Sequence, residues 1–201
     1  MIKLNKHFLK SSIAVQKSAR EMGRDDVAAI FVEDVKENGN MWRKYYCTDG
    51  VVLLFYKEKI EEIQIDGVAH FNFEKLPATK LIWYNIEIDN ETQVASIETE
   101  RGDFYVGYGD KDHTFVDKFE QIKNILEEEK IDSFNDATEF IIFSDTVLKK
   151  VKDYIGIGFY TMRPSVRNEN DQKSSEVFWH NPENTMIAVA MPMRLSERYK
   201  I

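Results

Sequence analysis

Residues 5–24 read NKHFLKSSIAVQKSAREMGR and predict a single helix over residues 6–22. Asn5 precedes this helix and is a favourable N-cap, because its side-chain oxygen can accept a hydrogen bond from a free backbone N–H of the first turn. Gly23 follows the last turn, where a left-handed backbone conformation is common. Leu4 and Leu9 occupy the two positions of a hydrophobic staple. These signals bound the helix at both ends.

The predicted helix separates apolar side chains from basic ones. At about 100° per residue, one side holds Phe8, Val15, Ala19 and Met22, and the opposite side holds Lys6, Lys10, Lys17 and Arg20. Ile13 interrupts the basic stripe. The first 24 residues contain six Lys or Arg and one Glu, whereas the whole chain contains 27 Lys and Arg against 35 Asp and Glu, for a net charge of −8. An acidic protein therefore concentrates its cations on one early segment.

The composition limits the class of protein. The chain has 201 residues, 43% hydrophobic and 31% charged, which favours a soluble protein of one large or two small domains. We find neither a run of about 18 apolar residues nor the apolar region of a secretory signal, so we expect no membrane span and no export. Cys47 is the single cysteine and cannot form an internal disulfide, which fits a cytoplasmic protein. The acidic total argues against nucleic-acid binding by the whole surface, but it is compatible with a local basic face.

Segments rich in β-branched and aromatic residues, separated by turn residues, predict strands. They lie at 27–36, 42–49, 51–58, 60–66, 68–73, 85–91, 93–100, 103–109 and 139–143, with further strands within 156–195. Helical spacing recurs at 118–131 and at 144–155, where Ser144 is the predicted N-cap. On the later helix the predicted inward residues are Val147, Leu148, Val151 and Ile155. Helix, strands and then a partial repetition of that order predict an α+β fold with mostly antiparallel pairing.

The sequence contains no assembled catalytic site, so we expect a protein that is not an enzyme and needs neither a cofactor nor a metal. There is no Walker loop, and Gly156-Ile-Gly158 lacks the third glycine and the following helix of a dinucleotide site. The four histidines are scattered without metal-ligand spacing. Cys47 lies in a predicted strand, where a buried inert thiol is the ordinary interpretation. A two-metal nuclease stays an alternative because carboxylates are plentiful, although no spacing selects a set.

The segment MIAVAMPMRL, residues 186–195, is the most specific string in the chain. It resembles the terminal strand of bacterial beta sliding clamps, the ring-shaped processivity factors of replicative DNA polymerases. The helix over 6–22, the pair Gly23-Arg24, and the strands VAAIFVEDV and YCTDGVVLLF resemble the first domain of those clamps. EFIIFSDTVLKKVKDYI resembles a strand and helix of their final domain, and FVDKFEQIKNIL resembles the short connector that follows a clamp domain.

The resemblance implies a DNA clamp-like fold, with antiparallel sheets on the outside and helices lining a central channel. It implies one clamp-like domain over residues 1–117 and a shorter one over 118–201 that ends in the MPMRL-type strand. Bacterial clamps of this type carry three domains per chain and form dimers, so a chain of this size suits a compact phage or prophage clamp. Three chains would supply the usual six domains, which favours a homotrimer. The residues SERYKI extend beyond Leu195, where the bacterial chains usually stop.

Two sets of residues follow from the resemblance. The expected DNA-binding residues, which would meet double-stranded DNA without reading its sequence, are Lys6, Lys10, Lys17, Arg20, Arg24, Lys149 and Lys152. The expected peptide-binding residues, which would border a pocket for a DNA polymerase and other clamp-binding peptides, are Val189, Met191, Pro192, Met193, Arg194 and Leu195. A clamp loader is a further implied partner. The plainer alternatives are a solvated helix face for the first set and an ordinary core strand for Val189.

Two functions from different classes therefore compete. The first is a sliding clamp that encircles duplex DNA and tethers replication proteins. The second is a clamp-like interaction or decoy protein that binds replication-factor peptides without encircling DNA. The metal-dependent nuclease is the third and weakest.

Overall fold

The computed structural model confirms an α+β fold built from antiparallel sheets. It describes residues 2–76, 83–89, 94–98, 104–108, 114–127, 143–155, 161–164, 177–183 and 185–190. The helices are α1 (Lys6–Glu21), α2 (Thr114–Glu127) and α3 (Asp145–Ile155), with a 3₁₀ turn, η1, at Asp25–Val27. The strands are β1 (Ile2–Asn5), β2 (Ile30–Glu37), β3 (Asn40–Thr48), β4 (Val52–Ile60), β5 (Val68–Phe71), β6 (Trp83–Asp89), β7 (Val94–Glu98), β8 (Phe104–Tyr108), β9 (Thr161–Pro164), β10 (Val177–His180) and β11 (Met186–Ala190).

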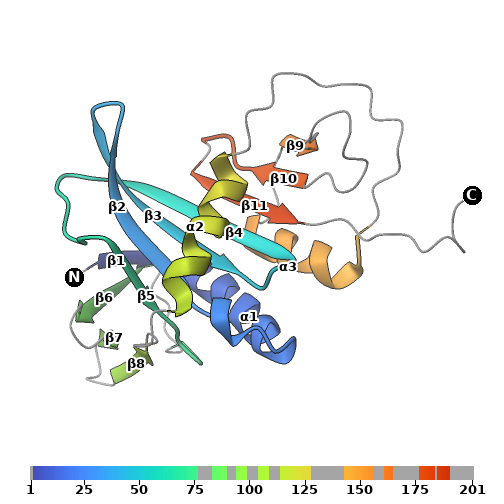
Figure 1. Ribbon diagram of the computed structural model, residues 1–201, viewed down its shortest axis with the longest axis horizontal. Helices are drawn as coiled ribbons and strands as arrows, with labels where there is room; N and C mark the ends of the chain where they lie inside the picture. Colours follow the sequence, from blue (N-terminus) through green and yellow to red (C-terminus); the bar gives the residue numbers. More distant parts are fainter. Residues whose placement is uncertain are drawn as a thin grey trace, which may run out of the picture.

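Strands from both ends of the chain form one large sheet (Figure 1). Its seven strands follow the order β5-β2-β3-β4-β11-β10-β9, and a smaller sheet has the order β1-β6-β7-β8. The late strand β11 pairs with the early strand β4 in a register that runs from Met186 opposite Tyr56 to Ala190 opposite Val52. This pairing is the junction between the two parts of the chain.

The predicted division into domains 1–117 and 118–201 stays a prediction. Its boundary falls inside α2, and elements from both sides share the large sheet. They also share a core, because Val151 and Tyr154 of α3 belong to the same buried cluster as Phe8 and Val15 of α1.

The local signals for α1 are confirmed. Asn5 is the N-cap, and its side-chain oxygen accepts a hydrogen bond from the backbone N–H of His7 over 2.7 Å. Gly23 follows the helix with a φ of 68°, in the left-handed region that a residue with a Cβ adopts only at a cost. Leu4 and Leu9 are both fully buried in one core cluster.

The β2–β3 hairpin follows from its turn residues. Asn38 and Gly39 have φ values of 50° and 79°, as a two-residue type I′ turn requires, and Glu37 pairs with Asn40 across it. Alternation along the strands then sends side chains to opposite faces of the sheet.

Both faces of the large sheet are covered by helices (Figure 1). Tyr45 and Cys47 of β3 lie in the buried cluster that contains the inward side chains of α1 and α3. Tyr46, between them, lies in a second cluster with Phe119 and Ile122 of α2. The sheet therefore separates a two-helix layer from a single helix on its other side.

Helix α2 is held to the second face by aromatic and charged contacts. The ring of Phe119 stacks on Phe31 with centroids 5.5 Å apart and meets Tyr46 edge-on at 5.1 Å. Lys123 Nζ lies 3.1 Å from a carboxylate oxygen of the buried Glu33, which also accepts a hydrogen bond from the Tyr46 hydroxyl over 2.8 Å. Burial of the apolar face of α2 and one charge-assisted contact together fix its position.

Several boundaries and faces differ from the prediction. Residues 61–66 are not a strand, because the backbone N–H groups of Gln64 and Ile65 donate to the Asp34 carboxylate at 2.8 and 3.0 Å instead of to a neighbouring strand. Helix α2 spans Thr114–Glu127, so it begins and ends four residues earlier than the predicted helix over 118–131. The strand β1 was not predicted, and it pairs with β6 across the register Ile2 opposite Ile86.

Two apolar residues predicted to face inward lie at the surface. Met22 is 47% exposed and Leu148 is 43% exposed. Met22 is the C-cap of α1, where the helical angle no longer applies. Leu148 falls at the edge of the apolar stripe of α3, whose buried residues are Val147, Val151, Tyr154 and Ile155. The predicted strand at 139–143 lies outside the described residues, apart from Phe143.

Candidate nucleic-acid interface and peptide pocket

Helices α1 and α3 lie side by side on one face of the large sheet (Figure 1). They run in opposite directions, since the start of α1 meets the end of α3. There the ring of His7 stacks on Tyr154 with centroids 6.3 Å apart, and His7 Nε2 is hydrogen-bonded to the Tyr154 carbonyl. Ser144 caps α3 by accepting a hydrogen bond from the Val147 N–H over 3.3 Å.

The outward side of this helix pair is rich in lysine. Of the residues predicted to bind DNA, Lys10, Lys17, Lys149 and Lys152 are exposed, while Lys6 and Arg20 are half-buried. The helix pair therefore brings six of the seven together from two segments more than 120 residues apart. The pairing of α1 with α3 could not be read from either helix alone.

Two of these lysines lie near acids of their own helix. Lys17 is 3.8 Å from Glu21, and Lys149 pairs with Asp153, in both cases across one helical turn. All four side chains are mostly exposed. Exposed pairs of this kind contribute little stability and exchange readily. Lys17 and Lys149 can therefore exchange these carboxylates for a more strongly charged anion at little cost in stability.

Lys150 points inward, although it is not among the residues of this helix that were predicted to face inward. Its Nζ donates to Ser18 Oγ over 2.7 Å and lies 2.5 Å from Asp49 Oδ2, whose side chain is fully buried. The other carboxylate oxygen of Asp49 accepts hydrogen bonds from the N–H groups of Val51 and Val52 at 2.9 and 2.8 Å. Lys150 thus ties the helix pair to the Thr48–Val52 turn between β3 and β4.

This arrangement predicts acid-sensitive stability. Burial alone would raise the pKa of Asp49, but hydrogen bonds from Lys150 and from the backbone of Val52 and Val51 hold it below its ordinary value. The resulting stability is present above about pH 4, the range of an unfolded aspartate, and is lost as the pH falls through the folded pKa. We expect urea unfolding between pH 3 and 7 to show a shallower acid dependence in Asp49→Asn than in the wild type. Parallel curves for the two proteins would contradict this assignment.

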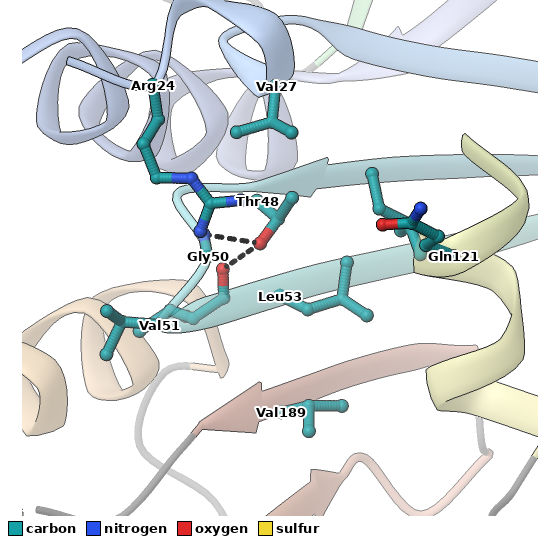
Figure 2. Close-up of a pocket in the computed structure, with 10 residues that line it drawn as sticks. Arg24, Val27, Thr48, Gly50, Val51, Leu53, Gln121 and Val189 are labelled. Carbon is teal, nitrogen blue, oxygen red and sulfur yellow. Dashed lines mark hydrogen bonds between the residues drawn. The ribbon is translucent and has the colours of Figure 1, made fainter. Parts of the chain in front are cut away.

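Arg24 does not lie with the lysines of the helix pair. Its guanidinium group extends over the turn at Gly50, where Nη1 would be only 1.5 Å from a Cβ built on that glycine. Gly50 has a φ of +85°, so the absence of a side chain serves both the turn and the space for the guanidinium. Figure 2 shows this approach together with the hydrogen bonds of the Thr48 hydroxyl to Gly50 and Val52.

Arg24 lines a small pocket of about 140 Å³ between the turn, α2 and β11 (Figure 2). The pocket is lined by Arg24, Val27, Thr48, Gly50, Val51, Val52, Leu53, Gln121, Ile122 and Val189. Its wall is thus mostly aliphatic, with α2 closing one side.

The structure places one predicted peptide-binding residue in this pocket. Val189 of β11 is 2% exposed, belongs to the cluster beneath α2 and lines the cavity. Met191, Pro192, Met193, Arg194 and Leu195 lie outside the described residues. The peptide site therefore stays a prediction, with Val189 as its described part.

Several residues of the pocket were not singled out from the sequence. Gln121 and Ile122 belong to a helix whose apolar spacing was recognised but whose position on the sheet was not. Thr48, Gly50 and Val51 belong to the turn between β3 and β4, which lies in the YCTDGVVLLF segment quoted for the family resemblance but was not assigned to a pocket. The sequence feature that could have indicated these pocket residues is the turn itself, together with the aliphatic residues Val51, Val52 and Leu53 that follow it.

Three further features of the described residues concern metal ligands, the cysteine and helix length. They contain no group of three or more His, Cys, Asp or Glu placed to hold a metal ion. Cys47 is fully buried, as predicted, and burial raises the pKa of its thiol to about 12. No helix within the described ranges has the length and apolar character that a bilayer crossing requires.

No protein-family model and no curated protein matches the chain. Solved structures that are similar to this chain at low identity include two bacterial proteins. The first is described as a DNA polymerase III beta subunit from Eubacterium rectale, with 9% identity, a TM-score of 0.43 and coverage of 96% of this chain and 64% of that one. The second is the DNA polymerase sliding clamp from Caulobacter crescentus, with 12% identity, a TM-score of 0.36 and coverage of 98% of this chain and 51% of that one. The chain thus spans less than two thirds of the length of either structure.

Proposed function

We propose that this chain is a subunit of a DNA sliding clamp, a processivity factor without enzymatic activity that encircles duplex DNA in the cytoplasm. The observation that carries the proposal is the antiparallel pair α1 and α3, which collects exposed lysines on one side of a chain with a net charge of −8. The MPMRL segment and the other motifs that resemble bacterial clamps support the same function, and the size of the chain suggests a compact phage or prophage type.

The physical basis is electrostatic attraction between the lysines and the DNA phosphates, without base-specific contacts. Lysine is a flexible, strongly hydrated point charge, so its contacts with phosphates form and exchange without base recognition. The acidic remainder of the surface repels DNA outside the basic face. A protein with this charge distribution can hold a duplex by enclosing it and still slide along it.

Closure of a ring would use strand edges. The described edges of the large sheet are β5 and β9, and an edge strand presents unpaired backbone groups that a second copy can bind. With two clamp-like domains per chain, at 1–117 and 118–201, three chains would give the six domains that the family resemblance implies. We therefore propose a homotrimer whose α1 and α3 helices line the central channel, opened by a loader.

Light scattering combined with size-exclusion chromatography, followed by negative-stain imaging, tests the proposal. We expect a mass of about three chains of 23.6 kDa and a hollow particle. Protein assembled on nicked circular DNA should stay bound during gel filtration and be released when the circle is linearised. A monomeric mass at micromolar concentration would contradict a clamp. Equal retention, or equal loss, on circular and linear DNA would also contradict it.

A clamp-like interaction protein is the second candidate, because the pocket beside Val189 is formed within one chain and needs no ring. It predicts binding of replication-factor peptides by a monomer, without dependence on DNA. The mass measurement separates the two candidates directly.

A further inference from the structure

The pocket combines an aliphatic wall with one cation. Val27, Leu53, Ile122 and Val189 supply apolar surface, and Arg24 is the only charged residue among those that line it. A cavity of about 140 Å³ is close in size to an engineered cavity of roughly 150 Å³ that holds a benzene ring. The pocket therefore has room for one large apolar side chain.

Backbone hydrogen bonds fix the position of Arg24. Its N–H donates to the Ala19 carbonyl over 2.9 Å at the end of α1, and its carbonyl accepts from the Val27 N–H over 3.3 Å. The guanidinium then crosses to Gly50, the one residue type that leaves room for it there. Two hydrogen bonds thus hold the Arg24 backbone, and its half-buried side chain reaches the pocket over Gly50.

No carboxylate of the described residues neutralises this guanidinium. The neighbouring Asp25 and Asp26 form no ion pair with it at 4 Å or less, and Asp49 in the adjacent turn is committed to Lys150 and to backbone N–H groups. The Thr48 hydroxyl already donates to the Val52 carbonyl and accepts from the Gly50 N–H. The planar guanidinium, with five N–H donors suited to a carboxylate, is therefore the charged group that this mostly aliphatic pocket offers to a partner.

We propose that this pocket binds a short partner peptide in which an Asp or Glu lies next to a large apolar side chain, and that Arg24 selects the acid. This inference rests on the proposed peptide-binding function. It also moves Arg24 from the DNA-binding set to the peptide pocket. The apolar side chain fills the cavity and the carboxylate pairs with the guanidinium.

Fluorescence polarisation with matched synthetic peptides tests the proposal. The probes are fluorescein-labelled octapeptides with a Gly-Ser background, a central Leu or Phe, and an Asp at each flanking position in turn. Each has a twin with Asn in place of Asp. Because a carboxylate makes a stronger, charge-assisted hydrogen bond with the guanidinium than an amide does, we expect the best Asp peptide to bind wild type about tenfold more tightly than its twin.

Arg24→Gln should abolish that preference while the twin binds as before, and Arg24→Lys should restore part of it. Lys59→Gln, which removes an exposed cation of β4 outside both proposed sites, is the matched control and should keep the full preference. Thermal unfolding confirms that each variant is folded. An unchanged acid preference in Arg24→Gln, or no binding of any peptide to wild type, would overturn the inference. The ring and its retention on circular DNA are measured without peptide, so failure of the clamp function is recognised separately.

Discussion

Asp34→Ala is expected to lower the free energy of unfolding by about 3–5 kcal/mol, because it leaves a buried guanidinium without its partner. The side chains of Asp34 and Arg43 are 0% and 5% exposed. Arg43 Nε and Nη2 donate to the two carboxylate oxygens over 2.7 and 2.8 Å, a bidentate geometry. The same carboxylate accepts the N–H groups of Gln64 and Ile65, so it also holds the 61–66 segment against β2.

Urea unfolding at pH 7 measures this loss, with two comparison variants. Asp153→Ala removes the acid of an exposed pair on α3 and should change stability little. Asp34→Leu combined with Arg43→Met removes both charges and should be less destabilising than Asp34→Ala alone, since no buried charge is left unpaired. If Asp34→Ala and Asp153→Ala shift the midpoint equally, the buried pair does not have the role described.

Features determined by neighbouring residues could be predicted from the sequence. The helix α1 was bounded correctly because Asn5 and Gly23 act within one turn of its ends. The Asn38-Gly39 turn likewise depends only on the backbone preferences of two residues. Local chemistry is sufficient in both cases, so no knowledge of the rest of the chain was needed.

Features determined by distant partners could not be predicted. Lys150 is placed on α3 where an outward lysine is expected, but Asp49, 101 residues earlier, draws it inward. The junction of β4 with β11 is likewise a pairing between strands more than 100 residues apart. The candidate site depends on both, since Lys150 holds the turn that lines the pocket and β11 supplies Val189.

The basic stripe of α1 is present, but the exposed surface around it differs in width from the one that the helical angles predicted. Burial covers Ser12 and Gln16 as well as the apolar side of α1, so the exposed strip is narrower than the helical angles indicated. Lys10 and Lys17 stay exposed within it, and two helical turns separate them by about 10 Å along the axis. They are therefore the α1 lysines best placed to reach an external phosphate.

Lys10→Glu combined with Lys17→Glu is expected to reduce retention on nicked circular DNA about a hundredfold. Each reversal replaces an attraction to phosphate, about 1 kcal/mol for charges 4 Å apart in water, by a repulsion of similar size, and salt screening reduces the total. Retention measured at several salt concentrations should also show a shallower salt dependence than wild type, because fewer counterions are released.

The matched control is Lys36→Glu combined with Lys59→Glu, which makes the same change in net charge. Both lysines are exposed, on β2 and β4, at the end of the β2–β3–β4 sheet that projects away from α1 and α3 (Figure 1). If attraction acts through the helix pair, the control keeps nearly wild-type retention and both double variants keep the mass of the assembled particle. An equal loss in the two double variants would mean that DNA responds to the total charge of the protein. In that case the concentration of lysines on one side of the fold would have no part in holding the duplex.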